Sequence, residues 1–278
     1  MVRRELLEML TCPESGLPLT GWDGVSQEGL LRCEDSEATY PVRDGIPVLL
    51  PLELQEGSAA LEVVSEVAEK KREMAARDAQ VGAYDRMMGL KVFTSAELPL
   101  SLHYLRPESD NLMLEGGCGT GRMTPAFAAA ARGLMALDFS MESLRVARDK
   151  LSPELQAKTL FIQADLSKLP LCTEVFDRVG SFGVYEHIPT PEARAKALSE
   201  MARVLKPRTA GGRFALSAYR WGPPQSWGSE REGHHDGGIY FYRFTKPELT
   251  AQVREHFEVR DFTETLLYYH LLWGRKPV

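Results

Sequence analysis

Apolar runs and amphipathic stretches alternate along the sequence from about residue 111 onward. The apolar runs suit buried strands, and they read NLMLEG, GLMALDF, TLFIQAD, DRVGSFGVY and GRFALSAY. The stretches between them have helical spacing, as in RMTPAFAAAAR, MESLRVARDKL and EARAKALSEMARVL. Strands that are apolar on both faces need cover on both faces, and a strict alternation of strand and helix supplies it. The pattern predicts an α/β fold with a doubly wound, mostly parallel sheet.

The last part of the sequence adds a helix-like stretch, KPELTAQVREHF, and two β-like runs, FEVRDFTET and LLYYHLLW. We expect these runs to close the sheet as an antiparallel hairpin, which gives seven strands. Residues 1–55 are different in character, because short extended runs such as GLPLTGW, GLLRC and ATYPVRDGIPVLLP are broken by turn residues. From Ser58 to about Gly89 the sequence is rich in Ala, Glu, Lys and Arg, with apolar residues at helical spacing. We therefore divide the chain into a small β-rich module (1–55), a helical linker or lid (56–110) and an α/β domain (111–278).

Composition and charge narrow the classes of function. The chain has 278 residues, 44% of them hydrophobic, and no apolar run approaches the roughly 18 to 20 residues of a membrane-spanning helix. The first residues lack the long apolar region of a secretory signal, so we expect a cytoplasmic protein without a membrane partner. Residues 1–55 contain four basic and ten acidic side chains, which equals the net charge of −6 of the whole chain. Such a front segment should repel phosphate groups.

The turn LEGGCGTGR, residues 114–122, follows the first strand-like run of the α/β domain. Glycine-rich turns at this place let backbone N–H groups approach a ligand. The P-loop pattern G-x-x-x-x-G-K-[ST] aligns with Gly116 and Gly121, but Arg122 and Met123 then stand where the phosphate-binding Lys and the magnesium-binding hydroxyl belong. The sequence argues against a P-loop at both chemically essential positions.

A dinucleotide-binding pattern G-x-G-x-x-G does not fit the same turn either. Starting it at Gly117 or Gly119 places the third glycine on Arg122 or Thr124, whose side chains would obstruct close packing of helix on strand. A diphosphate ligand is therefore not expected here.

An acidic residue followed by glycines at every second position fits the turn without a gap: Glu115, Gly117, Gly119 and Gly121. With this pattern, residues 112–207 resemble a class I S-adenosylmethionine-dependent methyltransferase, which has a Rossmann-like fold. The resemblance implies that the turn wraps the methionine end of the cofactor and that Glu115 helps to hold its ammonium group. Charge agrees, because this cofactor carries a sulfonium and an ammonium but no phosphate. We expect Cys118, within the same cofactor loop, to be a small buried filler rather than a nucleophile.

Two aspartates follow at matching places. Asp138 ends the second strand-like run, 21 residues after Gly117, where a two-oxygen acceptor can bind both ribose hydroxyls. The resemblance implies that Asp165 accepts from the adenine amino group, that the Leu166 amide serves a ring nitrogen, and that Phe139 and Leu166 are apolar walls. The alternatives are that Asp138 only caps the next helix and that Asp165 is an ordinary loop residue.

The segment FDRVGSFGVYEHIP resembles the fourth strand of the family and the loop after it. The resemblance implies that Tyr185, Glu186 and His187 face the transferring methyl group. If the acceptor must lose a proton, His187 or Glu186 could remove it. The alternative is a structural part for His187, which would orient the loop.

Residues 219–249 form a long connection rich in Gly, Pro, Trp, Tyr and His, and a connection of this length in an α/β domain is usually functional. We expect it to cover the acceptor pocket, with aromatic walls, arginines that clamp an anion, and the adjacent His234 and His235 near a metal or the substrate. No third ligand stands at a recognisable spacing, so we predict no metal. The expected walls are Trp221, Trp227, Tyr240 and Tyr242, and the expected clamps are Arg220, Arg231 and Arg243.

Residues 5–51 resemble the small zinc-ribbon proteins that act as activator subunits of RNA and protein methyltransferases. The resemblance lies in LLEMLTCPESGLPL and LRCEDSEATYPVRDGIPVLLP. A zinc ribbon needs C-x-x-C twice, but here Cys12 and Cys33 keep their thiols while Ser15 and Ser36 replace the second cysteines. We predict a metal-free module that docks on the larger domain or on a partner. Apolar packing should replace the metal's contribution, from Leu10, Leu19, Leu31, Tyr40, Ile46 and Val48.

These observations predict an S-adenosylmethionine-dependent methyltransferase that releases S-adenosylhomocysteine. The acceptor atom, O, N or C, stays open, with a small-molecule acceptor favoured. RNA is the alternative, because the relatives of the front module serve RNA-modifying enzymes. A non-catalytic, cofactor-binding regulatory protein is the third hypothesis, and the oligomeric state stays open.

Overall fold

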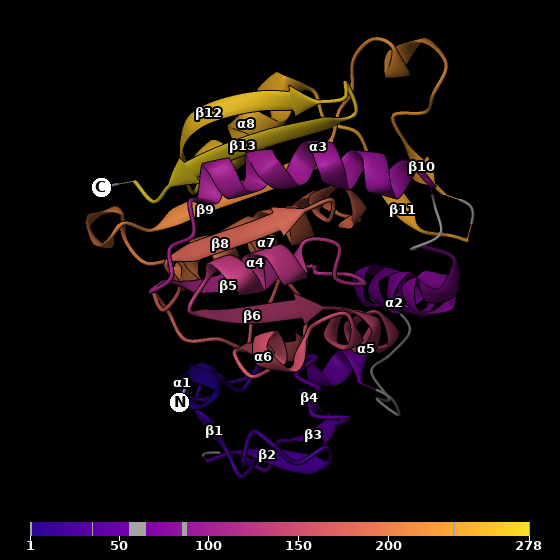
Figure 1. Cartoon of the computed structure of the whole chain (residues 1–278). Coiled ribbons are helices and arrows are strands. Elements are labelled where there is room, and N and C mark those ends of the chain that lie inside the picture. Colours follow the sequence, from indigo (N-terminus) through magenta and orange to yellow (C-terminus); the bar gives the residue numbers. More distant parts are fainter. Residues whose placement is uncertain (1, 35, 56–64, 85–87, 236, 278) are drawn as a thin grey trace.

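A central sheet of seven strands organises the chain, in the order β12-β13-β9-β8-β5-β6-β7 (Figure 1). The structure is a computed structural model that describes residues 2–34, 36–55, 65–84, 88–235 and 237–277. The five strands from β5 to β9 pair in parallel, whereas β13 pairs antiparallel with both β9 and β12. The prediction of a mostly parallel, seven-stranded Rossmann-like sheet with a C-terminal hairpin is confirmed. The strands are β5 (Leu112–Gly116), β6 (Gly133–Asp138), β7 (Thr159–Gln163), β8 (Arg178–Phe182), β9 (Arg213–Tyr219), β12 (Glu258–Thr265) and β13 (Tyr269–Arg275).

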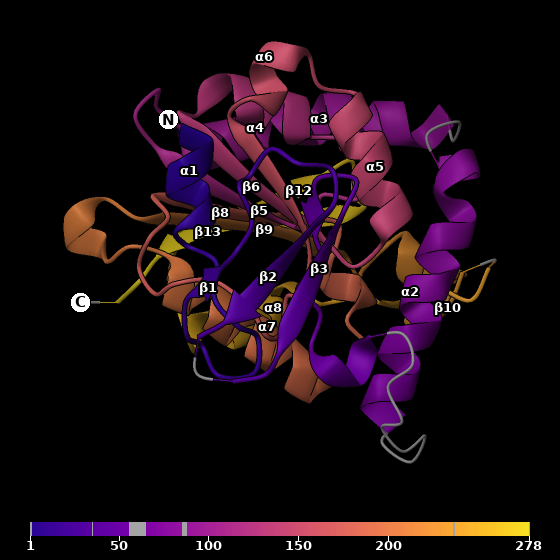
Figure 2. The same ribbon diagram turned by 90° about the horizontal axis from the view of Figure 1, so that it is seen from below.

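Helices cover both faces of this sheet (Figure 2). One face carries α3 (Met88–Leu105), α4 (Thr124–Ala130), α5 (Met141–Asp149) and the short α6 (Pro153–Gln156), and the other carries α7 (Pro191–Val204) and α8 (Lys246–Arg254). Local signals start these helices: Thr190 and Thr245 are N-caps, and each is followed by a proline in the first turn. Short 3₁₀ turns lie at Leu52–Leu54, Tyr185–His187, Arg208–Ala210 and Gln225–Trp227.

The strand order reverses at β5, which pairs with β6 on one side and β8 on the other. In sheets of this kind, helices leave the carboxyl ends of neighbouring strands toward opposite faces, and a crevice opens between them. The glycine turn at the end of β5 lies at this crevice, so the topology places it where a ligand is expected.

The linker region contains two helices, α2 (Ser65–Tyr84) and α3, while its residues 56–64 and 85–87 lie outside the described part of the chain. Helix α3 packs across β8, β9 and β13 and contributes Tyr104 and Leu105 to the core. Helix α2 stands at the side of the sheet next to α5, close to the carboxyl ends of the strands (Figure 1). Of the two helices, α2 is thus the one placed to cover the crevice.

The front module forms an antiparallel sheet of four short strands, as its turn-rich pattern predicts. It consists of α1 (Val2–Leu7), β1 (Leu19–Thr20), β2 (Gly29–Cys33), β3 (Thr39–Arg43) and β4 (Ile46–Pro47). The six apolar side chains expected to hold it together are all buried, at 8% exposure or less. Its core is continuous with that of the large domain, since one cluster of buried side chains includes residues of both, such as Leu10 and Leu49 with Ile162 and Leu171.

Backbone pairing fixes the module to the edge of the large sheet. Val48 forms a parallel bridge with Gln163 of β7, and the Leu49 amide donates to the Gln163 carbonyl at 2.8 Å. The Thr11 amide likewise donates to the Pro170 carbonyl at 2.8 Å. The module thereby covers the exposed edge strand β7.

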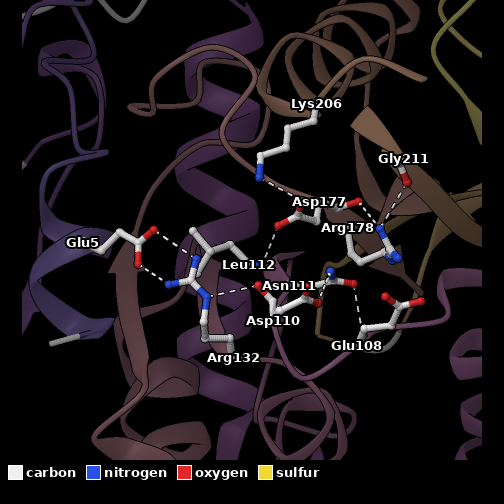
Figure 3. A network of polar contacts seen from close by, with 10 residues as sticks. All are labelled: Glu5, Glu108, Asp110, Asn111, Leu112, Arg132, Asp177, Arg178, Lys206 and Gly211. Carbon is white, nitrogen blue, oxygen red and sulfur yellow. Dashed lines mark hydrogen bonds and ion pairs between the residues drawn. The ribbon is translucent and has the colours of Figure 1, made fainter. Parts of the chain in front are cut away.

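A polar network strengthens the same junction (Figure 3). The Arg132 guanidinium forms a two-pronged ion pair with Glu5 of α1, at 2.5 and 3.0 Å, and its Nε donates to the Asp110 carbonyl at 3.0 Å. The Glu5 carboxylate raises the pKa of Arg132. Next to it, Asp177 accepts from the Leu112 amide at the start of β5 and from Lys206, both at 2.8 Å. The module is therefore tied to the loops at the amino ends of the central strands.

Among the described residues, none of the helices combines the length and the apolarity that a membrane crossing needs.

Because the two parts share a core, we predict that Leu49→Ala destabilises the whole chain. Leu49 is fully buried, so the truncation should lower the free energy of unfolding by about 2 to 5 kcal/mol. Calorimetry should record one transition, moved to lower temperature. The control Leu52→Ala removes a side chain that is 46% exposed and should change stability by less than about 0.5 kcal/mol. A separate early transition, with the main one unmoved, would mean that the module folds independently.

Candidate functional site

A cavity lies at the carboxyl ends of β5, β6, β7 and β8, and helix α2 forms one of its walls. Seven of the nine predicted cofactor residues line it, while Glu115 and Gly121, which belong to the same glycine turn, do not line it. The lining seven are Gly117, Cys118, Gly119, Asp138, Phe139, Asp165 and Leu166. The sequence analysis therefore located the cavity and most of one side of it.

The glycine turn is held against the end of β6 by its own backbone. The amides of Gly117 and Cys118 both donate to the Leu137 carbonyl, at 2.8 and 2.9 Å. Gly117 has a φ of +77°, and a Cβ there would stand 2.4 Å from the Val184 side chain, so only glycine fits. Gly119 has no neighbour within 4 Å of the place of a Cβ. Gly119 thus leaves open space beside the cavity that it lines.

Asp138 is fixed by two backbone amides. The Gly119 amide donates to Oδ2 at 2.8 Å, and the Ser140 amide donates to Oδ1 at 2.9 Å. Each carboxylate oxygen can accept a further hydrogen bond, so the group stays able to bind a pair of hydroxyls. Burial raises the pKa of Asp138 above its usual value. The cap of α5 is the Ser140 hydroxyl, which accepts from the Ser143 amide at 3.0 Å, so Asp138 is not its side-chain cap.

Glu115 and Gly121 support the turn from behind. The Glu115 carboxyl is buried and accepts from the Thr124 hydroxyl at 2.7 Å, and burial raises its pKa to about 8. A Cβ on Gly121 would stand 2.9 Å from Ala147 of α5, so this glycine permits close packing of the turn on that helix. Cys118 is 5% exposed, and burial raises the pKa of its thiol well above the usual value. This protonated thiol is unsuited to nucleophilic attack.

Asp165 already forms an ion pair with a lysine of the same chain. Its Oδ2 accepts from the Lys70 ammonium of α2 at 2.8 Å, and its Oδ1 accepts from the amide and hydroxyl of Ser167, both at 2.8 Å. Lys70 also pairs with Glu66 at 2.9 Å. Burial lowers the pKa of Lys70, but its two carboxylate partners outweigh this and raise it, so the ammonium stays charged.

Helix α2 supplies further charged residues that the sequence analysis missed. Lys70, Glu73 and Arg77 line the cavity together, and Arg122 of the glycine turn lies in the same lining. The first three are spaced by three and four residues, which places them on one face of a helix. This spacing was visible in the sequence, but α2 is charged on several sides, so the pattern alone did not show which face meets the sheet.

His187 lines the cavity from the 3₁₀ turn after β8. Its Nδ1 lies 2.6 Å from the Tyr240 carbonyl, and a carbonyl can only accept, so Nδ1 carries the proton. Burial lowers the pKa of His187 well below its usual value, which keeps the ring neutral. Its Nε2 therefore holds a lone pair, 4.0 Å from Glu186 Oε1. This is the protonation state that a general base requires.

The other two predicted catalytic residues do not line the cavity. Tyr185 is buried in the core, where its hydroxyl donates to Gln252 at 2.8 Å and its ring packs on Phe244 at 5.3 Å. Contrary to our expectation, it points toward α8 because the short 3₁₀ turn sends successive side chains in different directions. Glu186 is fully buried, and within the described residues neither of its carboxyl oxygens has a hydrogen-bond partner.

The side chains of the long connection 219–249 do not lie where the sequence analysis expected them. None of the side chains predicted there as walls, clamps or ligands is part of the lining, and several of them bind acidic residues of α8 and β12 instead. Arg231 and Tyr242 both bind Glu248, at 2.5 and 2.6 Å, and Arg220 binds Glu264 at 2.8 Å. The Arg243 guanidinium lies 4.4 Å from the centre of the Phe241 ring, and the His235 ring stacks on the same ring at 4.5 Å between centres. The His234 ring lies 5.8 Å from the Tyr240 ring, and Trp227 is 78% exposed. Trp221 is likewise not part of the lining.

One residue of this connection, Tyr240, does reach the site, through its backbone. Its carbonyl accepts from His187, and its amide donates to Glu73 of α2 at 3.2 Å. Tyr240 therefore links the wall helix to the histidine, while its hydroxyl donates to Glu232 at 2.8 Å.

The four positions of the front module that correspond to zinc ligands offer a poor donor set. Cys12 Sγ lies 3.2 Å from the Tyr40 hydroxyl, and Cys33 Sγ lies 3.3 Å from the Ser15 hydroxyl. Two thiols and two neutral hydroxyls do not suit tetrahedral zinc. In the part of the chain that the structure describes, no three His, Cys, Asp or Glu side chains gather in a way that could hold a metal ion.

Two family models match separate stretches of the chain. Residues 114–216 match the model described as a methyltransferase domain, and residues 3–45 match the model described as Trm112p-like protein. Among curated relatives, a demethylmenaquinone methyltransferase of Clavibacter sepedonicus is 32% identical over 144 residues, which cover 51% of this chain and 55% of the relative. A malonyl-[acyl-carrier protein] O-methyltransferase of Pectobacterium atrosepticum is 30% identical over 138 residues, which cover 49% and 48%. The chain thus spans about half the length of these relatives.

Solved structures share the fold. A chain of the Haloferax volcanii complex that contains the Trm112 methyltransferase activator is 18% identical, with a TM-score of 0.56, and the match covers 73% of this chain and 98% of that one. The 1,6-didemethyltoxoflavin-N1-methyltransferase of Burkholderia thailandensis, solved with S-adenosylhomocysteine, is 19% identical with a TM-score of 0.59, and the match covers 91% of this chain and 100% of that one.

The buried Glu186 predicts an unusual pH dependence of stability. Burial raises its pKa from 4.5 to about 8, so the folded chain holds a proton there that the unfolded chain releases. This contribution to stability is present below pH 4.5 and is lost as pH rises toward 8. Glu186→Gln mimics the protonated group, so its melting temperature relative to the wild type should rise steadily between these two pH values.

The exposed Glu53→Gln is the matched control, because it makes the same change of side chain at the surface. A melting-temperature difference between Glu186→Gln and the wild type that does not change between these pH values would show that burial does not raise the pKa of Glu186.

Proposed function

We propose that this chain, which joins a Trm112p-like domain to a methyltransferase domain, transfers the methyl group of S-adenosylmethionine to an O, N or C atom of a small-molecule acceptor. The observation that carries the proposal is the convergence of the glycine turn, Asp138 and Asp165 on one cavity at the carboxyl edge of the sheet. Their order along the sheet matches the methionine, ribose and adenine parts of that cofactor as the family resemblance implies.

The residues present fit this cofactor. Asp138 offers two carboxylate oxygens for the ribose hydroxyls, and Gly119 leaves space for close approach of the ligand to the turn. Glu115 lies behind the turn, so its part in holding the ammonium group is indirect unless the turn shifts. Lys70 shares Asp165 with any adenine amino group that binds there. When bound, S-adenosylmethionine supplies an electrophilic methyl group on a sulfonium that is already a good leaving group.

The protein's own work is then to orient the acceptor, exclude water and take up a proton where the acceptor has one to lose. Helix α2 closes the side of the cavity with Lys70, Glu73 and Arg77. His187 is held by the Tyr240 carbonyl in the tautomer that leaves Nε2 able to accept a proton. We therefore assign the base to His187, with α2 as the wall that keeps this side of the site dry.

Two features favour a small-molecule acceptor. The relatives with the stated activities act, by name, on demethylmenaquinone and on a malonyl group carried by a protein. The arginines of residues 219–249 that could have gripped a phosphate chain are paired with Glu248 and Glu264 or packed on Phe241.

RNA is the second candidate, and the Trm112p-like domain is the observation that favours it. The charge of residues 1–55, with four basic and ten acidic side chains, opposes direct contact of this domain with phosphates. In an RNA-modifying enzyme the domain would therefore act as a built-in activator of the methyltransferase domain. The third candidate, a regulatory protein that binds the cofactor without catalysis, shares the same cavity.

We predict that Asp138→Asn lowers the affinity for S-adenosylhomocysteine at least about 10-fold, which corresponds to the loss of about 1.4 kcal/mol from charge-assisted hydrogen bonds. Calorimetric titration measures it, and Asp149→Asn on the exposed end of α5 is the matched control. Transfer of labelled methyl from S-adenosylmethionine into a pool of metabolites should be lost in the same variant. Binding without any transfer to metabolites or RNA would favour the regulatory protein.

We also predict that bulk tRNA binds weakly and with little dependence on salt. A complex that neutralises several phosphates must weaken steeply as salt rises, because counterions are released on binding. Fluorescence titration of the protein with tRNA, at low and at physiological salt, measures this affinity and its dependence on salt. Tight binding at low salt that falls by orders of magnitude would instead support the RNA candidate.

A further inference from the structure

The carbonyl that supports His187 belongs to a hairpin that stands apart from the large sheet. This β10–β11 hairpin consists of β10 (Glu232–His234) and β11 (Tyr240–Tyr242), which in the described part of the chain form a separate two-stranded sheet. Figure 2 shows it next to α2. A two-stranded hairpin alone is only marginally stable, so the position of this one depends on the elements that touch it.

Helix α2 touches the β10–β11 hairpin at two places. Glu73 Oε2 accepts from the Tyr240 amide at 3.2 Å. Two helical turns later, Gln80 lies against the loop that joins the two strands, where a Cβ on Gly237 would stand 2.4 Å from Gln80 Nε2. The helix therefore packs closely on the hairpin, and Glu73 makes the hydrogen bond to its backbone.

The position of α2 is itself set by the large sheet. Lys70 donates to Asp165, which follows β7, at 2.8 Å. Asp78 accepts from the hydroxyl of Ser140, which follows β6, at 2.5 Å. Because these two contacts tie α2 to the ends of two central strands, Glu73 reaches the hairpin from a fixed support.

The Glu73 carboxylate is held between two donors. Arg77 Nε donates to its Oε1 at 2.9 Å, while its Oε2 receives the Tyr240 amide. The side chain is only 16% exposed, and burial raises its pKa although Arg77 and the Tyr240 amide oppose the rise. Burying a carboxylate is costly, and an uncharged side chain would avoid that cost. Since each oxygen has its own donor, the carboxylate has little freedom to turn away from Tyr240.

Both backbone polar groups of Tyr240 thus serve the site. Its amide is bound by Glu73, and its carbonyl lies 2.6 Å from Nδ1 of His187. The hydrogen bond at one nitrogen of a neutral histidine decides which of the two nitrogens carries the proton. If the Tyr240 carbonyl moves away, the proton can pass to Nε2, and His187 then no longer offers a lone pair to the acceptor.

We propose that Glu73 is a positioning residue for the base. It holds Tyr240 in place, so that the Tyr240 carbonyl keeps the proton of His187 on Nδ1 and leaves Nε2 open for a proton from the acceptor. The inference rests on the proposed function, in which His187 is the base. Helix α2 then both closes one side of the cavity and sets the tautomer of the histidine on the other side.

Nitrogen NMR of the full-length chain with ¹⁵N-labelled histidine tests this proposal at neutral pH. A protonated ring nitrogen and a nitrogen with a lone pair resonate at clearly separate frequencies, and long-range couplings to the ring C–H protons distinguish Nδ1 from Nε2. The signals of His187 are identified by their loss in His187→Gln. In the wild type we expect the proton on Nδ1 and the lone pair on Nε2. A wild-type proton on Nε2 would overturn the proposal.

In Glu73→Ala the two signals of His187 should move toward each other, because the ring then exchanges between its two tautomers. The matched control is Glu69→Ala on the same helix, which removes a carboxylate that lies 3.8 Å from the exposed Arg72. The control should keep the wild-type signals, and the melting curve of each variant shows whether it is folded. Wild-type signals in Glu73→Ala would contradict the assignment of Glu73.

Two conservative variants separate the hydrogen bond from the charge. Glu73→Asp keeps the charge but shortens the side chain by one methylene, so it should lose the 3.2 Å bond to Tyr240 and the wild-type signals of His187. Glu73→Gln keeps the length and one oxygen acceptor, so it should keep these signals. Wild-type signals in Glu73→Asp, or their loss in Glu73→Gln, would mean that the bond to Tyr240 does not set the tautomer.

Methyl transfer gives the functional readout. A general base contributes about 10²–10⁴-fold to a rate, so Glu73→Ala should slow the transfer of labelled methyl into a metabolite pool at least about 10-fold at saturating S-adenosylmethionine. An unchanged rate would overturn the positioning role. If the wild type transfers no methyl to any pool, the proposed function fails. The nitrogen signals then still decide whether Glu73 sets the tautomer of His187.

Discussion

The anchoring of the glycine turn on the end of β6 is the interaction on which the site depends. The Leu137 carbonyl receives the amides of Gly117 and Cys118, and the next amide, of Gly119, fixes the Asp138 carboxylate. Turn and carboxylate are thus positioned by the same short stretch of backbone. Because Gly117 also lies against Val184, the loop after β8 that carries His187 is placed by the same contact. The turn after β5, the carboxylate at the end of β6 and the loop after β8 are thereby held in one fixed arrangement.

Buried acids dominate the electrostatics of this arrangement. Burial raises the pKa of Glu115, Asp138 and Glu186, each of which lies at or just behind the cavity wall. Helix α2 offsets part of the negative charge with Lys70 and Arg77. A positively charged ligand relieves the repulsion and desolvation of these carboxyl groups.

The sequence predicted the sheet and the residues that line one side of the cavity because both depend on short-range patterns. Alternating apolar and amphipathic runs mark the successive strands and helices, and the turn from Glu115 to Gly121 is contiguous. What it did not predict depends on tertiary packing. The face of α2 that carries Lys70 is set by tertiary contacts such as those with Asp165 and Tyr240, and Arg231 is paired with Glu248 of α8, which folding brings beside it.

Calorimetric titration of the unmodified chain with S-adenosylhomocysteine, NAD and ATP, each in a separate experiment, tests the central claim most directly. An acid-led turn and two aspartates around one cavity predict heat of binding, at one site per chain, for S-adenosylhomocysteine alone. Saturable binding of NAD or ATP, with no response to S-adenosylhomocysteine, would contradict the account, because the glycine turn and the two aspartates would then hold a phosphate-bearing ligand instead.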